Sequence, residues 1–479
     1  MWTPASTLKG LYVRNVNIRI MFLFIDREEE LDFLKERYGK EDFDFIVIYG
    51  RRRIGKTELL KNFVKEVPHV YFLCNKAGTA TNVQRFKKQV ARFFREPEIA
   101  SEDLEEIFSY IVSKAKEKLV IIFDEFPYLV EKDGAVPSLF QQVIDCVLKN
   151  EKMMLVICGS SISMMEELLG YKNPLYGRKT GHIKVKHLKF KHLKEFFPKS
   201  SKEEIIQIYS ILGGVPFYLE KFDAEKSALE NAKEQILSKR GMLYEEVDFL
   251  LKEEFREPDI YKNILSAMAS GRTRVAEISD RSIIKASDMD RYLKSLMRIG
   301  IIKKEIPVTE IKSKKTLYTI EDNFFDFYFL FFEPNRSDIE IGETRSVEDM
   351  LERDFNMYVG RKFEKLVREE VLRYLCPFSA TKTGRWWGFY RDAGKRMELE
   401  IDAICLNGNV NEILFVECKW KHLSERKASN ILEELKRKSR FVQWNNDVRK
   451  EYFGIVAKKI EGKCELRGKG FFVYDLDDF

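Results

Sequence analysis

Histidine and paired cysteine are both scarce in this sequence. The 479 residues include 5 histidines and 7 cysteines, and no two cysteines form a Cys-x-x-Cys pair. The histidines show no metal-ligand spacing, so the sequence gives no sign of a zinc site. Scattered cysteines without a pairing pattern are typical of a reducing compartment, and we therefore expect a cytoplasmic protein.

Long apolar runs are also lacking. No stretch approaches the roughly 18 consecutive apolar residues that a membrane-spanning helix needs. The longest candidate, FFDFYFLFF at residues 324–332, is short and contains Asp326, which favours a buried core element. No signal peptide is evident either. We therefore expect no membrane partner.

The charge balance is only mildly positive. The formal net charge is +6 and the isoelectric point is near 8.6, which permits a nucleic-acid partner without requiring one. The composition, 44% hydrophobic and 33% charged, is that of a globular protein. A chain of this length exceeds one hydrophobic core, so we expect two to four domains.

A phosphate-binding loop follows the first apolar strand. The strand DFDFIVIYG, residues 42–50, leads into GRRRIGKT, which matches G-x-x-x-x-G-K-[ST], and then into a helical pattern. Glycines let backbone N–H groups surround phosphates, and the helix N-terminus adds positive potential. Lys56 should reach the β- and γ-phosphates of ATP, and Thr57 should bind Mg²⁺. The expected nucleotide contacts are Gly50, Arg51, Arg52, Arg53, Ile54, Gly55, Lys56, Thr57 and Glu58.

Two acidic residues end a second apolar strand. KLVIIFDEFPYL, residues 118–129, reads as a central parallel strand whose carboxyl end is where ligands bind in α/β sheets. Asp124 should hold Mg²⁺, and Glu125 should polarise the attacking water. Both assignments depend on the upstream loop, since Asp-Glu after a strand is also a common loop start.

A third apolar strand, MMLVICGSS at residues 153–161, ends in hydroxyl side chains. Ser160 or Ser161 is a candidate sensor of the γ-phosphate, and an N-cap for the next helix is an equally good interpretation. The alternation of strands and helices over residues 45–185 predicts a parallel sheet covered by helices.

The order of short motifs resembles a known family. The motifs are FIDREEELDFL, IYGRRRIGKT, IIFDEF, ICGSS, PLYGR and GGVPFYL. In residues 24–222 they look like the archaeal ATPase family within the STAND class of P-loop NTPases, which are related to AAA+ proteins. The resemblance implies that Arg178 acts on the nucleotide or reports its state, and that Pro216 packs near the base or sugar from a helical lid. It also implies a switch-like ATPase and allows a homo-oligomer.

The middle of the chain changes character. Over residues 243–320, two short helical patterns precede SDMDRYLKSLMRIG, in which Ser287 and Asp290 fit a capping box and Gly300 fits a C′ glycine. Two alternating segments around a polar turn then predict a hairpin. Three helices and a β-wing make a winged helix-turn-helix.

One face of the third helix is basic. Arg291, Lys294 and Arg298 are spaced to share the side opposite the apolar stripe, as in a helix that reads the DNA major groove. A solvated basic face has the same pattern, and Asp288 and Asp290 would repel phosphate at the helix N-terminus. A protein-interaction or regulatory spacer is therefore the competing interpretation.

The last third contains a hairpin with charged residues inside apolar strands. MELEIDAICL and EILFVECKW flank the turn NGNVN, and the midpoint of positions 402 and 417 falls inside that turn. Asp402 and Glu417 should therefore lie opposite one another, with Cβ atoms about 5 Å apart. Facing carboxylates repel unless a cation or proton joins them. Mg²⁺ would resolve this repulsion, with Lys419 orienting the attacking water. A salt bridge between Glu417 and Lys419 on an exposed strand is the alternative.

This Asp…Glu-x-Lys pattern looks like the PD-(D/E)xK nuclease superfamily, which has a restriction-endonuclease-like fold. The resemblance implies that Glu364, on the preceding helix, adds a carboxylate to the metal site. GRWWG followed by EIDAI also resembles the C-terminal domain of archaeal ATPases. The first acid follows Ile401 rather than proline, as in divergent members, and cleavage activity stays open. Basic residues that could clamp a DNA or RNA backbone, or simply be solvated, are Lys421, Arg426, Lys427, Lys436, Arg437, Lys438 and Arg440.

The sequence thus predicts an α/β protein in five parts. They are an N-terminal extension (1–22), a P-loop ATPase core (23–187), a helical lid (188–242), a winged helix-turn-helix (243–322) and a nuclease-like domain (323–479). Two functions fit: an ATPase coupled to nucleic-acid binding and cleavage, or a nucleotide-switched regulator with an inactive C-terminal domain.

Overall fold

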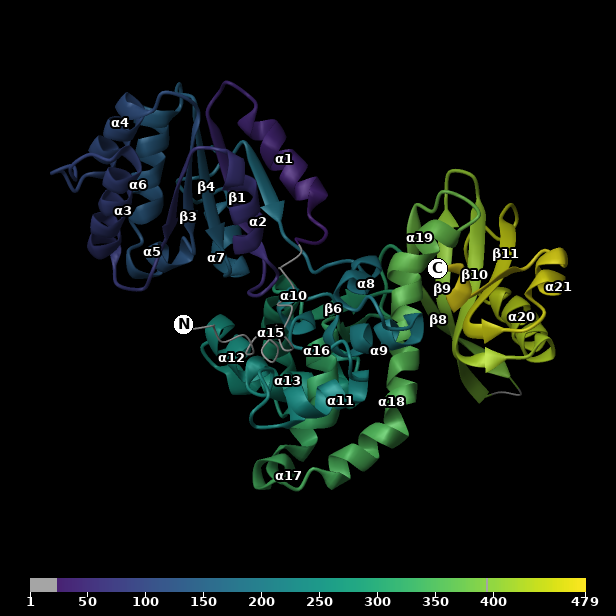
Figure 1. Ribbon diagram of the computed structural model, residues 1–479. Coiled ribbons are helices and arrows are strands. Elements are labelled where there is room, and N and C mark those ends of the chain that lie inside the picture. Colours follow the sequence, from purple (N-terminus) through teal and green to yellow (C-terminus); the bar gives the residue numbers. More distant parts are fainter. Residues whose placement is uncertain (1–23, 393–394) are drawn as a thin grey trace, which may run out of the picture.

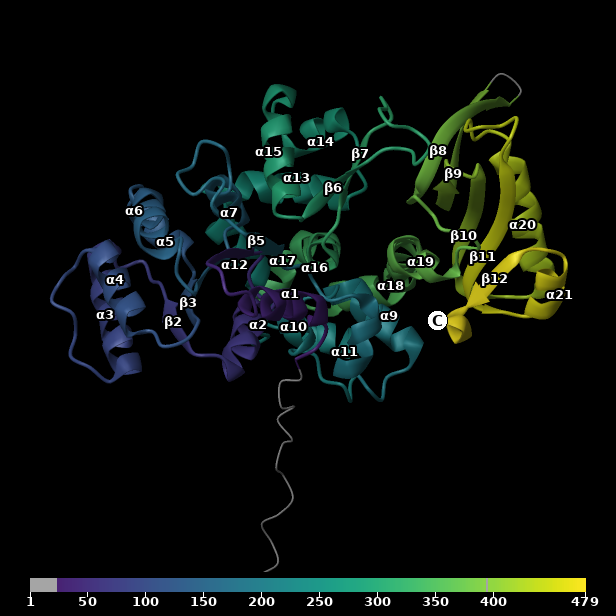
Figure 2. The same ribbon diagram turned by 90° about the horizontal axis from the view of Figure 1, so that it is seen from above.

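The structure is a computed structural model that describes residues 24–392 and 395–479. The expected N-terminal extension, residues 1–22, lies outside the described residues. Three bodies lie side by side: an N-terminal sheet with its helices, a helical middle, and a C-terminal sheet (Figure 1). A view turned by 90° shows the helical middle, with α13 and α16, between the two sheets (Figure 2). No helix in the described part of the chain is long and apolar enough to cross a membrane.

The N-terminal sheet is parallel, as predicted. In the described residues its five strands run in the order β2-β3-β4-β1-β5, and every neighbouring pair is parallel. The central strands are apolar at nearly every position because helices bury both of their faces. The strands are β1 (Asp44–Tyr49), β2 (His69–Leu73), β3 (Leu119–Asp124), β4 (Met153–Gly159) and β5 (Gly181–Lys184).

Helices cover both faces of this sheet. Ile46 and Ile48 of β1 pack with α1 and α2 on one face, and their neighbours Phe45 and Val47 pack with α3, α4 and α6 on the other. Because successive side chains of a strand point to opposite faces, β1 contributes to the hydrophobic core on each face of the sheet. The helices are α1 (Glu28–Tyr38), α2 (Lys56–Phe63), η1 (Val64–Glu66), α3 (Thr79–Phe94), α4 (Leu104–Lys114), α5 (Pro127–Lys132), α6 (Val136–Gln142), η2 (Val143–Leu148) and α7 (Ile162–Leu168).

The middle body is mostly helical. Its first part contains η3 (Phe190–His192), α8 (Leu193–Phe196), α9 (Lys202–Leu212), α10 (Pro216–Leu219), α11 (Ala228–Ala232), η4 (Lys233–Leu237) and α12 (Glu246–Glu254). Three helices and an antiparallel hairpin follow: α13 (Pro258–Ala269), α14 (Val275–Ser282), α15 (Ala286–Arg298), β6 (Ile302–Glu305) and β7 (Leu317–Ile320). The apolar run at 324–332 is a buried helical element, as expected, formed by α16 (Asn323–Phe327) and η5 (Tyr328–Phe332). The body ends with η6 (Glu333–Asn335) and α17 (Arg336–Ile341).

The predicted start of the third helix is wrong. α15 begins at Ala286, its N-cap residue is Lys285, and no side chain caps it. Ser287 lies within the first turn, so the capping box of Ser287 and Asp290 does not form. The predicted end is correct, because Gly300 follows the C-cap Ile299 with a φ of 73°.

The C-terminal body is a mixed sheet with helices on both sides. In the described residues its strand order is β12-β11-β10-β9-β8, antiparallel from β8 to β10 and parallel from β10 to β12. A long helix precedes it: α18 (Arg345–Leu366), continued by η7 (Val367–Val371) and α19 (Leu372–Leu375). The remaining elements are β8 (Lys382–Asp392), β9 (Lys395–Asn407), β10 (Glu412–Leu423), α20 (Glu425–Ser439), β11 (Lys450–Ile460), α21 (Lys463–Gly468), β12 (Phe472–Asp475) and η8 (Leu476–Asp478).

The predicted hairpin register is confirmed. β9 pairs with β10 from Glu412–Asn407 to Val416–Ala403, so Asp402 and Glu417 are the next residues along this register. The turn between the strands covers residues 408–411, within the predicted NGNVN segment. The apolar alternation of both strands fixes this pairing, because a slip of one residue would expose the core side chains.

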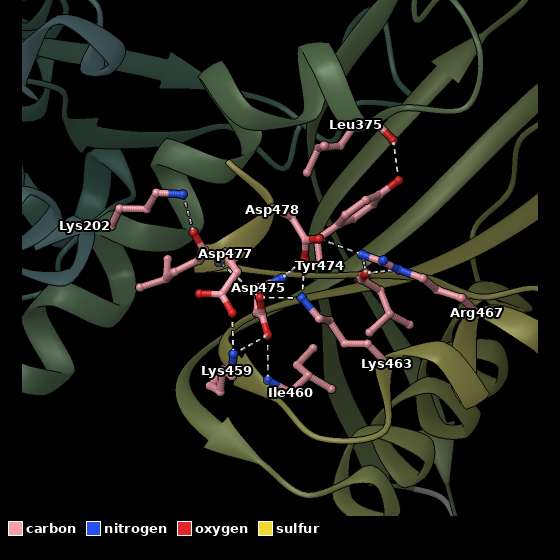
Figure 3. A network of polar contacts seen from close by, with 12 residues as sticks. Lys202, Leu375, Lys459, Ile460, Lys463, Arg467, Tyr474, Asp475, Asp477 and Asp478 are labelled. Carbon is pink, nitrogen blue, oxygen red and sulfur yellow. Dashed lines mark hydrogen bonds and ion pairs between the residues drawn. The ribbon is translucent and has the colours of Figure 1, made fainter.

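The C-terminal segment docks on the helical middle. Asp475, at the end of β12, accepts a hydrogen bond from Lys463 at 2.7 Å, and Lys463 also donates to Asp478 at 2.8 Å (Figure 3). Lys202, at the start of α9, reaches the Leu476 carbonyl at 2.8 Å. This network fixes the last residues of the chain against α9 of the helical middle.

Close backbone approach requires glycine at position 214. Leu188 N–H donates to the Gly214 carbonyl at 2.7 Å, and a Cβ at Gly214 would lie 2.0 Å from the Leu188 oxygen. We expect Gly214→Ala to lower the free energy of unfolding by about 1–3 kcal/mol, as overpacking does. Denaturant unfolding followed by circular dichroism measures this loss. Gly134→Ala is the control, because a Cβ at Gly134 meets no atom within 4 Å; equal stability of the two variants would contradict the prediction.

Candidate functional site

Glycines shape the loop between β1 and α2. A Cβ at Gly50 would lie 2.5 Å from the Val185 carbonyl oxygen, so only glycine fits there. Gly55 has a φ of 90° and serves as the N-cap residue of α2. Ile54 is buried in the core beneath the loop. The loop therefore presents the N-terminus of α2 at the carboxyl edge of the sheet, where phosphate binding is favoured.

Lys56 is the first residue of α2 and is 6% exposed. Its ammonium group donates to the carbonyls of Gly50 and Arg51, at 2.8 Å each. Burial lowers the pKa of Lys56. The lysine is thus folded back on its own loop, within reach of any anion that the loop holds.

Thr57 and Asp124 meet as the sequence predicts. Thr57 Oγ1 donates to Asp124 Oδ2 at 3.0 Å, and the Tyr71 hydroxyl donates to the same oxygen. Asp124 is 2% exposed. A hydroxyl and a carboxylate this close offer the oxygen ligands that Mg²⁺ prefers.

Glu125 and Ser160 also come together. Glu125 has a φ of 54°, and its Oε2 accepts hydrogen bonds from Ser160 Oγ at 2.7 Å and from Ser160 N at 3.3 Å. Ser161 is the N-cap residue of α7 and makes no side-chain cap. Ser160, which follows β4, therefore fixes the position of the Glu125 carboxylate, which follows β3.

The three loop arginines all form ion pairs with downstream segments. Arg52 pairs with Glu253 of α12 at 2.8 Å, and Arg53 pairs with Glu246 of the same helix at 2.6 Å. Arg51 pairs with Asp322, which precedes α16. Glu58 instead lies near Lys61, one turn along α2, at 3.8 Å. The loop is thus attached to the helical middle by three ion pairs.

The structure does not bring Arg178 to the P-loop of its own chain. Arg178 precedes β5, and Thr180 N–H bonds to the Phe45 carbonyl at the amino end of the sheet, whereas Gly50 lies at the carboxyl end, roughly 16 Å further along β1. The Arg178 guanidinium is paired with Asp145 at 2.6 Å. Arg178 is therefore engaged with Asp145 at the amino end of the sheet, and its role toward the nucleotide stays a prediction.

Pro216 is the first residue of α10. The next residue, Phe217, stacks under the Arg53 guanidinium, with 4.1 Å between the guanidinium carbon and the ring centroid. The segment that contains Pro216 is therefore in contact with the P-loop, and the packing of Pro216 near the base or sugar stays a prediction.

The second site lies at the centre of the C-terminal sheet. The Lys419 ammonium donates to Asp402 Oδ2 at 3.0 Å and to Glu417 Oε2 at 2.7 Å. Although burial works to lower it, the two carboxylates raise the pKa of Lys419. Asp402 also accepts a hydrogen bond from Cys418 N at 2.8 Å. The predicted Asp, Glu and Lys thus form one contiguous cluster.

Three further ionisable side chains surround this cluster. Lys438 of α20 donates to Glu417 Oε1 at 2.7 Å, and Arg368 of η7 donates to the Asp402 carbonyl at 2.8 Å. Burial and the charge of Asp402 raise the pKa of Glu364 to about 8. Glu364 is therefore protonated at neutral pH, which relieves repulsion between the carboxylates.

The acidic residues do not gather as the three-ligand set that was predicted. Among residues 24–392 and 395–479, no group of three or more His, Cys, Asp or Glu side chains is arranged to hold a metal ion. Lys419 joins Asp402 to Glu417 instead. Mg²⁺ sites commonly use only one or two carboxylates with water, so this pair keeps a suitable donor set.

The basic face of α15 is partly engaged. Arg298 donates to Glu166 at 3.1 Å and to the Ser163 carbonyl at 2.8 Å, both in α7. Lys294 pairs with Asp290 of its own helix at 2.7 Å. The expected three-residue DNA-reading face is therefore reduced, because Arg298 serves an interface within the chain.

Several site residues have no signal in the sequence. Tyr71 and Arg368 reach the sites from neighbouring elements, and the glutamates of α12 reach the loop from some two hundred positions away. Their roles depend on tertiary contacts. Lys438 has no distinguishing signal among the basic residues of α20, since this helix is basic along much of its length.

Comparisons with known proteins identify two parts of the chain. Residues 24–222 match an ATPase domain that occurs predominantly in Archaea, and residues 328–431 match archaeal and bacterial proteins of unknown function. The Walker-type ATPase of Pyrococcus abyssi shares the fold, with a TM-score of 0.50 and 22% identity over 64% of this chain and 95% of that one. The chain therefore contains a P-loop ATPase domain of the archaeal type.

Curated relatives define the family. An uncharacterized protein of Methanocaldococcus jannaschii is 44% identical over 463 residues, which cover 95% of this chain and 100% of that protein. An uncharacterized ATP-binding protein of the same organism is 39% identical over 54 residues, 11% of this chain and 92% of that protein. The chain belongs to the family of the first of these proteins.

The raised pKa of Glu364 predicts a pH-dependent stability. The folded chain holds a proton on Glu364 up to about pH 8, whereas the unfolded chain releases it near 4.5. The wild type should therefore lose stability relative to Glu364→Gln as the pH rises between these values, by about 1.4 kcal/mol per pKa unit at most. Urea unfolding of both proteins from pH 4 to 9 measures the difference. A difference that grows in favour of the wild type with rising pH would contradict the assignment.

Proposed function

We propose that the chain is a STAND-type switch ATPase that hydrolyses ATP with Mg²⁺ and thereby controls a nuclease-like C-terminal domain that acts on nucleic acid. The contact between Thr57 and Asp124, next to Lys56 and Glu125, is the observation that carries the ATPase part. The C-terminal part is supported by the Asp402, Glu417 and Lys419 cluster.

Each residue of the P-loop site has a role in this proposal. Lys56 would leave the carbonyls of its own loop and bind the β- and γ-phosphates. Thr57 and Asp124 would hold Mg²⁺, which neutralises phosphate charge when bound. Glu125 would orient the attacking water and accept its proton. Ser160 would position Glu125 through their hydrogen bond.

The nuclease-like hypothesis is supported by the topology of the C-terminal body as well as by the Asp402, Glu417 and Lys419 cluster. A helix (α18), three antiparallel strands (β8–β10), a crossover helix (α20) and a parallel strand (β11) follow one another, and the three site residues lie on β9 and β10. Asp402 and Glu417 would hold Mg²⁺, with Glu364 beside them. Lys419 would orient a water against the scissile phosphate. The basic side chains of α20 would hold the nucleic-acid backbone.

The helical middle supports two further parts of the proposal. α13, α14 and α15 with the β6–β7 hairpin have the arrangement of a winged helix, for which we propose nucleic-acid or protein binding. Arg178 lies too far from its own P-loop to contact that nucleotide. Its proposed role therefore applies to a nucleotide on a second copy of the chain, in a homo-oligomer.

One observation favours the alternative, a regulator whose C-terminal domain only binds. Lys419 and Lys438 both form ion pairs with Glu417, so two positive charges already compensate the two carboxylates of the cluster. A metal ion would have to compete with both lysines. In this alternative the cluster is a structural charge network, and ATP hydrolysis still requires Lys56.

Two substitutions test the ATPase assignment. Lys56→Ala should abolish ATP binding, because the loop loses its phosphate ligand. Glu125→Gln should keep binding and lose hydrolysis by about 100-fold or more, since removal of a general base typically costs 10²–10⁴. Phosphate release measures turnover, and binding of a fluorescent ATP analogue measures affinity. Unchanged turnover in both variants would refute the assignment.

Cleavage is tested by Asp402→Ala. Wild-type protein should cut labelled DNA or RNA in the presence of ATP with Mg²⁺ or Mn²⁺, and the variant should not, because the proposed metal carboxylate is removed. Glu398→Ala is the matched control, since Glu398 is an exposed carboxylate on β9, the strand of Asp402, and lies outside the cluster. Identical products from wild type and Asp402→Ala would support the inactive, regulatory alternative.

A further inference from the structure

Charged contacts connect the P-loop to the residues that precede α16. Arg51, the first residue after Gly50, pairs with Asp322. Their side chains are 18% and 7% exposed, so the pair is largely withdrawn from water. The Arg51 guanidinium also lies 5.4 Å from the Phe325 ring centroid. Any displacement of this part of the loop therefore acts on the start of α16.

A second contact continues from there to α18. Glu321, the neighbour of Asp322, pairs with Lys365 at 3.1 Å, and Lys365 also donates to the Glu321 carbonyl. Burial opposes ionisation of Glu321, but Lys365 and Lys303 outweigh it and lower the pKa to about 2. This end of the connection is therefore charged at every physiological pH.

α18 and its continuation η7 then reach the second site. Glu364 adjoins Lys365, and Arg368 is one helical turn further, roughly 4.5 Å along the axis. Arg368 donates to the carbonyl of Asp402, and Phe363 packs on Trp420 of β10 with 5.1 Å between ring centroids. One helix thus contacts the P-loop connection and both strands of the acidic cluster.

We propose that Arg51, Asp322, Glu321 and Lys365 form a relay that couples nucleotide binding at the P-loop to the arrangement of the Asp402–Glu417–Lys419 cluster. The relay rests on the proposed ATP binding, and it gives that function a route to the C-terminal domain. It does not require that the cluster cleave a substrate.

The P-loop contains the step that starts the relay. Lys56 is bonded to the carbonyls of Gly50 and Arg51, and it must release them to reach a phosphate. The two peptide units then lose their cationic partner and reorient. Arg51 carries this change to Asp322, because separating a buried ion pair leaves an uncompensated charge and costs more than moving the two residues together.

A cavity lies beside this connection. Its volume is about 230 Å³, and its walls come from the P-loop, β5, the lid, α15 and α18, including Arg51, Val215, Met297, Asp322 and Lys365. Space at the junction lets residues 321–322 shift without a clash in the packed core. The relay residues are therefore connected by ion pairs and border open space.

One substitution in each of its two ion pairs interrupts the relay with little change of shape. Asp322→Asn removes the charge but keeps the N-cap of α16, where Asp322 accepts a hydrogen bond from Phe325 N at 2.9 Å. Lys365→Met keeps the length of the side chain, and Glu321 retains its pair with Lys303 at 3.0 Å. Neither residue contacts the phosphates or the cluster directly in the proposed function.

Hydrogen exchange of the full chain, with and without a non-hydrolysable ATP analogue and Mg²⁺, measures the coupling. In wild type the analogue should change the exchange rates of amides at residues 400–420 by about fivefold or more, within the usual range of allosteric coupling. Both variants should bind the analogue with affinity within about threefold of wild type, yet show less than about a twofold change at residues 400–420.

Glu203→Gln is the matched control. It removes the ion pair between Glu203 of α9 and Lys458 of β11, which also joins the lid to the C-terminal sheet but lies off the relay. Its response at residues 400–420 should equal that of wild type. A wild-type response that persists in both relay variants, or that is lost in Glu203→Gln as well, would overturn the relay.

Failures of the relay and of the proposed function are distinguishable. Absence of analogue binding to wild type would contradict the proposed ATPase. Analogue binding without any response at residues 400–420 would leave the ATPase intact and overturn the relay alone.

Discussion

The ion pair between Arg51 and Asp322 ties the phosphate-binding loop to the rest of the chain. A P-loop needs only glycines, a lysine and a hydroxyl residue to hold phosphates, so its intervening positions are free to serve other contacts. In this chain three of them are arginines, and each is paired with a carboxylate of the helical middle. Of the three arginines, Arg51 has the most direct connection to the C-terminal body. Its partner Asp322 immediately precedes α16, and the neighbouring Glu321 forms an ion pair with Lys365 of α18. The loop is therefore both a binding site and a structural joint.

The two sites differ in how their charges are balanced. At the P-loop, Lys56 is satisfied by backbone carbonyls, and Asp124 by hydroxyl donors, which are uncharged partners that a nucleotide and a cation can replace at modest cost. At the C-terminal cluster, Asp402 and Glu417 are neutralised by Lys419 and Lys438. Displacing charged partners from a buried site is more costly. The P-loop can therefore accept a nucleotide and a cation at lower cost than the cluster can accept a metal ion.

Local sequence was sufficient for much of this architecture. The apolar runs predicted the parallel sheet, and the register of Asp402 against Glu417 followed from one tight turn and a period of two. Thr57 and Asp124 met because the carboxyl ends of parallel strands share one edge. Contacts that depend on how bodies pack were not predictable: Arg178 belongs to the opposite edge of the sheet, Arg298 to an interface with α7, and Lys438 to the acidic cluster. The capping box at Ser287 failed because the helix begins two residues earlier than that box implies, with Lys285 as its N-cap residue and no side-chain cap.

The central claim is that phosphate binding moves Lys56 while the connection from Arg51 to Asp322 stays closed. A crystal structure of the protein with a non-hydrolysable ATP analogue and Mg²⁺ tests it most directly. The account predicts that Lys56 Nζ lies within hydrogen-bonding distance of the β- and γ-phosphates, no longer bonded to the carbonyls of Gly50 and Arg51, and that Arg51 remains paired with Asp322. A bound nucleotide with Lys56 still on those carbonyls, or with the Arg51–Asp322 pair broken, would contradict it.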